Sequence, residues 1–229
     1  MTDTNAELSV KLNKAWRFFY GRGFIDGFGH ISARTSVPDH ILISPHSLAH
    51  NSKPEDFVLV DLKGRIVAGD ARLPGELSIH LALYKHRSDV GSVAHFHCLY
   101  ATSFSMSEVP LGTSYFLASI FRDGIPIHPD SRFINDTKRG FALAQTLGNR
   151  RAALLKAHGV VIAGADIVEM VATAFILEDN ARRTWTSAAM GKVEFLSDEI
   201  MAEIEAEVLT QRGPFRRIWA LCESEYEAG

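Results

Sequence analysis

The sequence has few cysteines and no long apolar run. Its two cysteines, Cys98 and Cys222, lie far apart among 229 residues and lack the close spacing of a thiolate zinc site. No stretch approaches the roughly eighteen consecutive apolar residues of a membrane-spanning helix. The first residues lack the charged and apolar regions of a signal peptide. We therefore expect a cytoplasmic protein with reduced thiols and no membrane partner.

An excess of positive charge is also missing. Lysine and arginine number 24 against 27 aspartates and glutamates, and the basic residues are scattered. Because a phosphate backbone requires a concentrated positive field, nucleic acid is not expected as a partner. The chain also lacks the Gly-x-x-x-x-Gly-Lys loop of NTPases, the His-Glu-x-x-His helix of zinc peptidases and the Gly-x-Ser-x-Gly turn of serine hydrolases. These common enzyme classes are not supported.

The chain does have enough apolar residues, 46% of the total, to bury a sizeable core, and no linker-like stretch divides it. We expect one domain, residues 1–229, of the α/β class. Apolar residues at spacings of three and four predict a helix over residues 5–20. Further helices are predicted over residues 75–86, 100–105, 130–147, 167–190 and 197–209. Strands are predicted over residues 30–34, 41–44, 57–61, 65–68, 92–97, 152–157 and 160–163.

Three histidines and a glutamate are the strongest chemical signal. His95 and His97 are two residues apart in an apolar predicted strand, so both rings lie on one side of it. His158, between two predicted strands, is a third candidate ligand, and Glu76 lies at the start of a predicted helix. A lone histidine beside apolar residues is usually a hydrogen-bonded core residue. The combination favours a metal site, because imidazoles bind divalent first-row metals.

Six short motifs follow one another along the chain: Gly29-His-Ile-Ser-Ala-Arg34, Ile43-Ser-Pro45, Val60-Asp-Leu-Lys-Gly64, Pro74-Gly-Glu76, Ala94-His-Phe-His97 and His158-Gly159. Together they resemble the class II aldolase and adducin family, in the family's order and over roughly residues 8–210. The resemblance implies a three-layer α/β/α sandwich around a central mixed, largely antiparallel sheet. It also implies a homo-oligomer, with a tetramer favoured and sites at subunit interfaces.

The same resemblance implies roles for the four residues. His95, His97 and His158 would hold one divalent ion per subunit, and Glu76 would be the acid/base residue or a displaceable fourth ligand. The ligand types leave the metal open, with manganese or zinc expected and cobalt or iron as alternatives.

The chain departs from the sugar-phosphate aldolases of that family where those enzymes hold phosphate. In place of their Gly-Asn, Thr-Gly or Ser-Gly, and Ser-Ser pairs, it has Gly29-His30, His46-Ser47 and Pro74-Gly75. Proline has neither a hydroxyl nor an amide donor, and glycine has no side chain. A phosphorylated substrate is therefore disfavoured.

A carboxylate needs fewer donors than a phosphate, so we interpret this region as a pocket for a small-molecule carboxylate. The candidate substrate contacts are His30, Arg34, Ser44 and His46. The alternative is that His30 and His46 are exposed loop histidines and that Arg34 is structural. His80, four residues after Glu76, is expected to orient Glu76 or to pack beside it.

The motifs are most similar to the branch that decarboxylates ortho-hydroxy aromatic or pyridine dicarboxylates, such as 3-hydroxy-2-methylpyridine-4,5-dicarboxylate decarboxylase. That resemblance implies a lyase of aromatic catabolism. The substrate hydroxyl and its adjacent carboxylate would bind the metal, and Glu76 or a nearby histidine would protonate the ring carbon as carbon dioxide departs. Rings that would flank a flat substrate, or else form ordinary core, are Phe24, Phe28, Phe96, Tyr115 and Phe116. An aldolase for a non-phosphorylated hydroxy-keto acid and a non-catalytic, adducin-like binding module remain alternatives.

Overall fold

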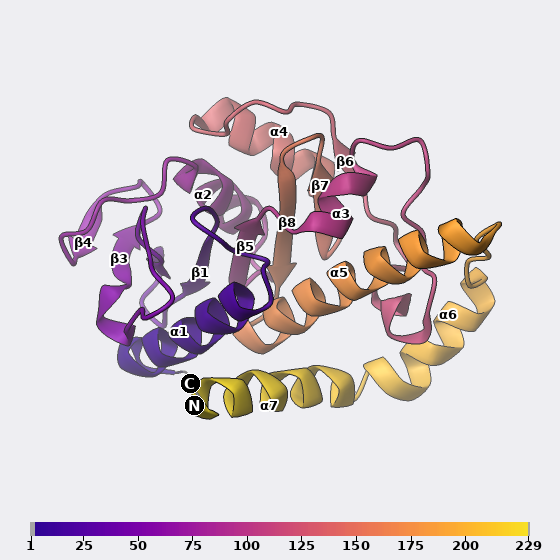
Figure 1. Ribbon diagram of the computed structural model, residues 1–229. Coiled ribbons are helices and arrows are strands. Elements are labelled where there is room, and N and C mark those ends of the chain that lie inside the picture. The colour runs from indigo at the N-terminus through magenta and orange to yellow at the C-terminus, as the bar shows by residue number, and fades with distance from the viewer. Residues whose placement is uncertain (1–2, 229) are drawn as a thin grey trace.

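A computed structural model describes residues 3–228 and contains one eight-stranded sheet in the order β4-β3-β2-β1-β5-β8-β7-β6 (Figure 1). Neighbouring strands are antiparallel except for β6 and β7, which are parallel. The predicted mixed, largely antiparallel sheet is confirmed. The strands are β1 (His30–Arg34), β2 (His40–Ile43), β3 (Val58–Asp61), β4 (Ile66–Ala68), β5 (Ser92–Phe96), β6 (Ile127–His128), β7 (Ala152–Leu155) and β8 (Gly159–Gly164).

Helices cover both faces of the sheet and make the predicted three layers. On one face, α2 (Leu77–His86) and α4 (Thr137–Leu147) pack over one apolar core. On the other face, α1 (Asn5–Gly21) and α5 (Ile167–Met190) pack over a second core. Figure 1 shows α2 and α4 above the sheet and α1 and α5 below it. The α/β/α sandwich is therefore confirmed.

The C-terminal region adds a helix that the sequence analysis did not predict. The predicted helix over residues 197–209 is present as α6 (Asp198–Ile204), continued by a π-helical turn (Glu205–Leu209). The chain then turns and forms α7 (Gly213–Ala228), with Pro214 in the first turn, where a missing N–H is tolerated. Figure 1 shows α7 running beside α1, and Lys14 of α1 forms a 2.8 Å ion pair with Glu223 of α7.

The predicted helix over residues 130–147 starts later than expected, at Thr137. The Asp130 carboxylate accepts the N–H of Arg132, and Asp136 caps α4 by accepting the N–H of Arg139. Between them, the Ile134 N–H donates to Glu76. Side chains therefore satisfy these backbone donors outside a helix, and the segment forms a loop against the start of α2.

The remaining helical elements are short. They are α3 (Leu99–Phe104) and two 3₁₀ turns, Pro54–Asp56 and Phe116–Phe121. Within residues 3–228, none of the helices is both long and apolar enough to span a bilayer.

Candidate metal centre

Two neighbouring strands and one helix start bring the predicted ligands together. His95 lies in β5, and His97 directly follows that strand. β5 pairs with β8, and His158 occupies the turn that leads from β7 into β8. Glu76 is the N-cap residue of α2. Residues far apart in the sequence therefore meet at one end of the central strands.

The three imidazole rings converge on a common point. Ring centroids are 5.1 Å apart for His95 and His97, 5.0 Å for His95 and His158, and 5.4 Å for His97 and His158. One ring nitrogen from each lies within 4.8 Å of the other two. Nitrogens that share one tetrahedral ion lie about 3.4 Å apart. The predicted grouping of the three histidines is therefore present in the fold.

Each of the three rings has one buried nitrogen without a hydrogen-bond partner among the described residues. The Nδ1–H of His95 donates to the Val160 carbonyl at 2.9 Å, which leaves the lone pair on Nε2. Among the described residues, Nε2 of His95, Nε2 of His97 and Nδ1 of His158 are buried without a hydrogen-bond partner. Burial, followed by the charges of His95 and His158, lowers the pKa of His97 to about 4. Neutral imidazoles with unsatisfied lone pairs fit a divalent cation.

Glu76 closes this group. Its Oε2 lies 3.4 Å from Nε2 of His95 and 3.5 Å from Nε2 of His158, and its Oε1 accepts the Ile134 N–H at 2.8 Å. Burial alone would raise the pKa of Glu76, but His158, His95 and the Ile134 N–H together hold it well below its usual value. The side chain is therefore a buried carboxylate with one oxygen fixed and the other beside the histidines. That arrangement suits a fourth ligand or a base.

His30 joins the group from β1. It pairs with His95 across β1 and β5, with ring centroids 5.0 Å apart. One of its nitrogens lies within 4.8 Å of ligand atoms of Glu76 and His95. Its Nδ1 is 2.7 Å from Nε2 of His80, so His80 is hydrogen-bonded to His30, a contact that the sequence analysis did not anticipate. Burial, then His80 and His95, lowers the pKa of His30 well below its usual value.

Two glycines permit this close assembly. Gly29 has φ +110, and a Cβ there would lie 3.1 Å from the His95 carbonyl oxygen. At Gly159 a Cβ would lie 2.5 Å from the Phe96 carbonyl oxygen and 2.6 Å from the His97 ring. Any side chain at either place would push β1 or β8 away from the end of β5.

The structure does not bring the other candidate substrate contacts into this group. Ser44 is fully buried, and its hydroxyl oxygen accepts the Ile31 N–H at 3.0 Å. His46 is exposed, and its Nδ1 lies 2.9 Å from the Ser47 hydroxyl. The exposed-loop alternative therefore describes His46 in this structure.

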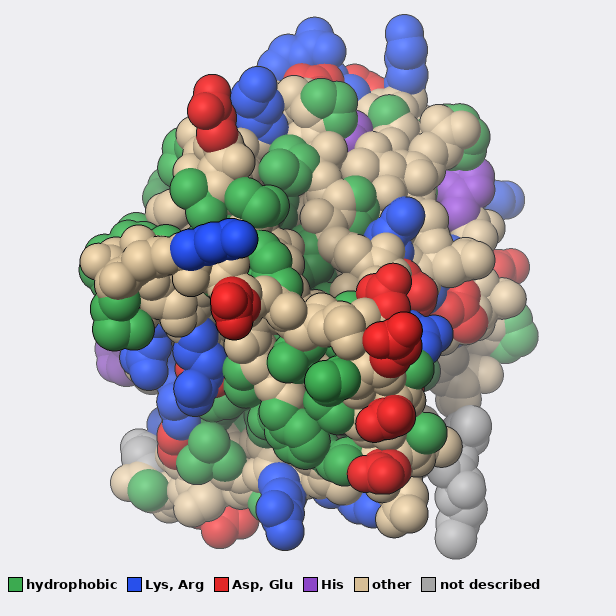
Figure 2. All heavy atoms as spheres, turned by 90° about the vertical axis from the view of Figure 1, so that its right-hand side faces the viewer, with side chains coloured by type: hydrophobic (Ala, Val, Ile, Leu, Met, Phe, Trp, Pro, Cys, Tyr) green, Lys and Arg blue, Asp and Glu red, His purple; other side chains and the backbone are tan. Residues whose placement is uncertain are grey.

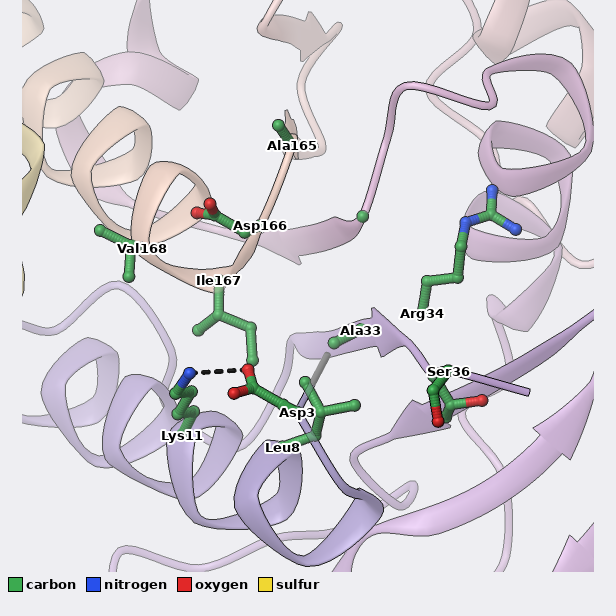
Figure 3. A pocket seen from close by; sticks show the side chains of 12 residues that line it. Asp3, Leu8, Lys11, Ala33, Arg34, Ser36, Ala165, Asp166, Ile167 and Val168 are labelled. Carbon is green, nitrogen blue, oxygen red and sulfur yellow. Dashed lines mark hydrogen bonds and ion pairs between the residues drawn. The ribbon is translucent and has the colours of Figure 1, made fainter. Parts of the chain in front are cut away.

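Arg34 lies at the opposite end of β1 from His30, about 13 Å away along the strand. Its guanidinium donates to the carbonyls of Tyr84 and Val90 at 2.9 and 3.2 Å. Figure 3 shows it beside a pocket, pointing away from the Asp3–Lys11 ion pair. The structural alternative describes Arg34, because its donors satisfy carbonyls at and beyond the end of α2.

The candidate rings also divide into two kinds. Phe24 and Phe96 are core residues, stacked on each other at 5.6 Å, which corrects their candidacy as substrate flanks. Phe28 is 69% exposed, and its ring lies 6.1 Å from that of His97. Phe133, which the sequence analysis missed, is 52% exposed, and its ring would lie 2.5 Å from a Cβ at Gly75.

Other site residues were also missed. Ile134 contributes through its backbone, for which a sequence gives no signal. Ser32 and Tyr84 bond to each other, and Ser32 also bonds to His80. A signal for Tyr84 did exist, because Glu76, His80 and Tyr84 follow one another at intervals of four along α2 and share a helix face.

Residues 10–185 match the family described as the Class II Aldolase and Adducin N-terminal domain. The 5-deoxy-D-ribulose 1-phosphate aldolase of Bacillus thuringiensis serovar kurstaki is 29% identical over 77% of this chain and 83% of its own. The 3-oxo-tetronate 4-phosphate decarboxylase of Haemophilus influenzae is 27% identical over 90% and 98%. The 3,4-dihydroxyphthalate decarboxylase of Rhodococcus jostii is 28% identical over 83% and 85%.

A solved structure gives the same fold. The crystal structure of an aldolase II superfamily protein from Pseudomonas syringae matches with a TM-score of 0.87 at 23% identity, over 100% of this chain and 95% of that one. The predicted fold class is confirmed. A single domain over residues 1–229 stays a prediction, since the family match stops at residue 185.

Proposed function

The chain belongs to the class II aldolase and adducin family and is a lyase of that family, and from this premise we propose that it decarboxylates an ortho-hydroxy aromatic or pyridine dicarboxylate. The three relatives are nearly equal in their identity to this chain. Two are named for a sugar-type phosphate and one for dihydroxyphthalate. Similarity alone therefore does not choose among these substrates, and the choice depends on the site of this chain.

The contact between Gly75 and Phe133 is the observation that supports an aromatic substrate. Pro74 and Gly75 precede Glu76 and offer no side-chain donor to a phosphate dianion, which needs several. The Phe133 ring takes the space of a side chain at position 75. With Phe28 beside His97, two exposed aromatic rings border the histidine and glutamate cluster. Aromatic faces of this kind bind flat rings favourably.

The residues present can carry out the reaction. A divalent ion held by the three histidines would supply a Lewis acid for negative charge on the substrate oxygens. Glu76, ionised, accepts the substrate hydroxyl proton at Oε2 and delivers it to the ring carbon that bears the carboxylate. The carbon–carbon bond then breaks, its electron pair restores the aromatic ring and its oxyanion, and carbon dioxide leaves. Because the Ile134 N–H occupies Oε1, proton transfer is assigned to Oε2.

We further propose one manganese or zinc ion per subunit, a homotetramer and a cytoplasmic location. Figure 2 shows hydrophobic side chains gathered on the face at the α5–α6 end. Trp185 and Met190 near the end of α5 are 56% and 79% exposed, and Phe195 is 38% exposed. Large apolar side chains exposed together are typical of a contact surface. Light scattering should give four times the 25.3 kDa of one chain, and a monomer mass would contradict the tetramer.

A substrate panel tests the reaction. The purified full chain, loaded with manganese or zinc, is incubated with 3,4-dihydroxyphthalate, 3-hydroxy-2-methylpyridine-4,5-dicarboxylate, 3-oxo-tetronate 4-phosphate and 5-deoxy-D-ribulose 1-phosphate. We expect carbon dioxide release from an aromatic dicarboxylate only. Turnover of a phosphorylated compound alone would overturn the aromatic assignment. A non-phosphorylated hydroxy-keto acid is incubated in parallel, and pyruvate or an aldehyde formed from it would favour the aldolase alternative.

A further inference from the structure

A line of four buried, hydrogen-bonded side chains runs from the metal centre into the protein. His30 Nδ1 lies 2.7 Å from His80 Nε2, and His80 Nδ1 lies 2.6 Å from the Ser32 hydroxyl. The Ser32 hydroxyl lies 2.8 Å from the Tyr84 hydroxyl. None of the four is more than 6% exposed. The proposed decarboxylation uses none of these contacts, so they need a separate explanation.

Two elements supply this line alternately. His30 and Ser32 are two residues apart on β1 and share one face of the strand. His80 and Tyr84 are four residues apart on α2 and share one face of the helix, with Glu76 four residues before His80. The packing of α2 on the sheet therefore interleaves the side chains of the two elements.

The hydrogen positions can be deduced from the Tyr84 end. Burial raises the pKa of Tyr84, so the hydroxyl keeps its hydrogen. Among the side chains of the described residues, Ser32 Oγ is the acceptor that lies within hydrogen-bond distance of the Tyr84 hydroxyl. A buried hydroxyl hydrogen without an acceptor is costly. Tyr84 therefore donates to Ser32.

The donor role of Tyr84 fixes the donor and acceptor roles of the next three side chains. Ser32 accepts from Tyr84 and has its own hydrogen to donate to His80 Nδ1. A neutral His80 that accepts at Nδ1 carries its hydrogen on Nε2 and donates it to His30 Nδ1. His30 then carries its own hydrogen on Nε2, the one ring nitrogen that His80 does not occupy.

We propose that Tyr84, Ser32 and His80 are positioning residues that hold His30 as its Nε2–H tautomer, so that His30 offers the site a fixed hydrogen-bond donor. The identity of its acceptor rests on the proposed function: it is an oxygen of the carboxylate that the substrate retains. In the other tautomer, His30 would present a lone pair and repel that oxygen. The line thus selects substrates with an acceptor at this place.

The tautomer is measured by solid-state NMR on the zinc-loaded full chain labelled with ¹⁵N-histidine, with the His30 signals assigned by their loss in His30→Gln. We expect the hydrogen on Nε2 in both His30 and His80. Ser32→Ala removes the donor to His80 and should give a mixture of His30 tautomers. Ser32→Thr keeps a hydroxyl and should resemble the wild type.

Two results would overturn the proposal: a wild-type His30 with its hydrogen on Nδ1, or a His30 signal unchanged by loss of the Ser32 hydroxyl. If Ser32→Ala does not fold, Tyr84→Phe, which removes the terminal donor, is measured in its place with the same expected mixture. Neither measurement requires turnover, so a wrong substrate assignment leaves this test intact.

Kinetics give a second readout. In Ser32→Ala the KM for the active dicarboxylate should rise by the inverse of the remaining fraction of the Nε2–H tautomer, about twofold for an even mixture, with metal content unchanged. A fall in kcat at constant KM, with His30 still a single tautomer, would indicate a merely structural role and contradict the proposal. If the wild type has a single His30 tautomer and Ser32→Ala a mixture, but the wild type converts no compound of the panel, the proposed function alone is rejected.

Discussion

The Nδ1–H of His95 donates to the carbonyl of Val160 at 2.9 Å. Val160 lies in β8, which directly follows the turn that contains His158, so the strand beside one proposed ligand holds the ring of another. Hydrogen bonds of this kind fix the tautomer and orientation of metal-ligating histidines. The paired strands β5 and β8 therefore arrange the donor atoms themselves.

Replacing His95 by alanine should remove the metal. The other two imidazoles would keep their places, but two neutral ligands hold a divalent ion much more weakly than three. We expect the metal content, measured by plasma mass spectrometry, to fall from about one ion per subunit to near zero. His46→Ala, on an exposed loop, is the control and should retain metal. An unchanged content in His95→Ala would favour the binding-module alternative.

Glu76→Gln should separate metal binding from catalysis. Glutamine keeps an oxygen that can accept the Ile134 N–H, now made to Glu76 at 2.8 Å, but it cannot take up a proton. Loss of a general acid/base group lowers kcat by about 10²- to 10⁴-fold. Metal content should remain near that of the wild type. If kcat stayed within about twofold of the wild type, the proton would have to move through another residue.

Much of the fold and the grouping of the three histidines with Glu76 was predictable because it depends on local pattern. The spacing of His95 and His97 fixes both rings on one side of a strand whatever else surrounds it. Alternating apolar residues and turns likewise placed the main strands within a few residues. The order of the motifs supplied the rest, since it linked His158 and Glu76 to the same site.

The missed contacts join residues with no local relationship. Ile134 donates to Glu76 from 58 positions away, and Phe133 covers Gly75 from the same loop. Residues 130–136 are rich in aspartate, serine and asparagine, which favour caps and turns, so the sequence carried a signal for the later helix start at Thr137 that the predicted helix overlooked. Arg34 was misassigned because its type suits an anion, whereas its position at the far end of β1 brings it to backbone carbonyls.

The Gly75–Phe133 contact should appear as coupling between two substitutions. Gly75→Ala places a methyl group where the Phe133 ring now lies, 2.5 Å from its Cζ atom, and should cost about 1–3 kcal/mol of unfolding free energy. Phe133→Ala should relieve most of that cost in the double variant. Urea denaturation of the four proteins checks this. Additive effects would show that the ring moves aside freely.

Phe133→Ala alone should also weaken binding of an aromatic substrate. Loss of one stacking face is expected to raise KM about tenfold while metal content stays constant. Phe141→Ala is a matched control, since that ring is 41% exposed on α4 and packs against His86 instead of the site. Equal KM values for the two variants would remove Phe133 from the substrate pocket.

Arg34 should contribute to stability and not to substrate binding. Arg34→Ala removes donors from the carbonyls of Tyr84 and Val90, so the unfolding free energy should fall by about 1–3 kcal/mol. KM and metal content should not change. A raised KM in a variant of wild-type stability would restore Arg34 as a substrate contact.

Acid should destabilise the metal-free protein through His80. Burial, followed by the charge of His95, lowers the pKa of His80 from 6.5 to about 3 in the folded state. As the pH falls below 6.5, the unfolded chain therefore binds a proton that the folded protein does not, and stability declines by up to about 1.4 kcal/mol per pH unit. Glu76 affects stability in a lower pH range, because a lowered carboxyl pKa reduces stability only when the pH falls below about 4.5.

Urea denaturation of chelator-treated protein at pH 7 and pH 5 measures this slope, and His80→Gln is the matched variant. Glutamine keeps a polar side chain but does not titrate, so the stability of His80→Gln should depend less on pH over this interval, even if the variant is less stable at pH 7. The wild type should lose more free energy of unfolding between the two pH values than the variant does. An equal loss in both proteins would mean that His80 is protonated in the folded state, which would contradict the neutral ring assigned to it beside His30.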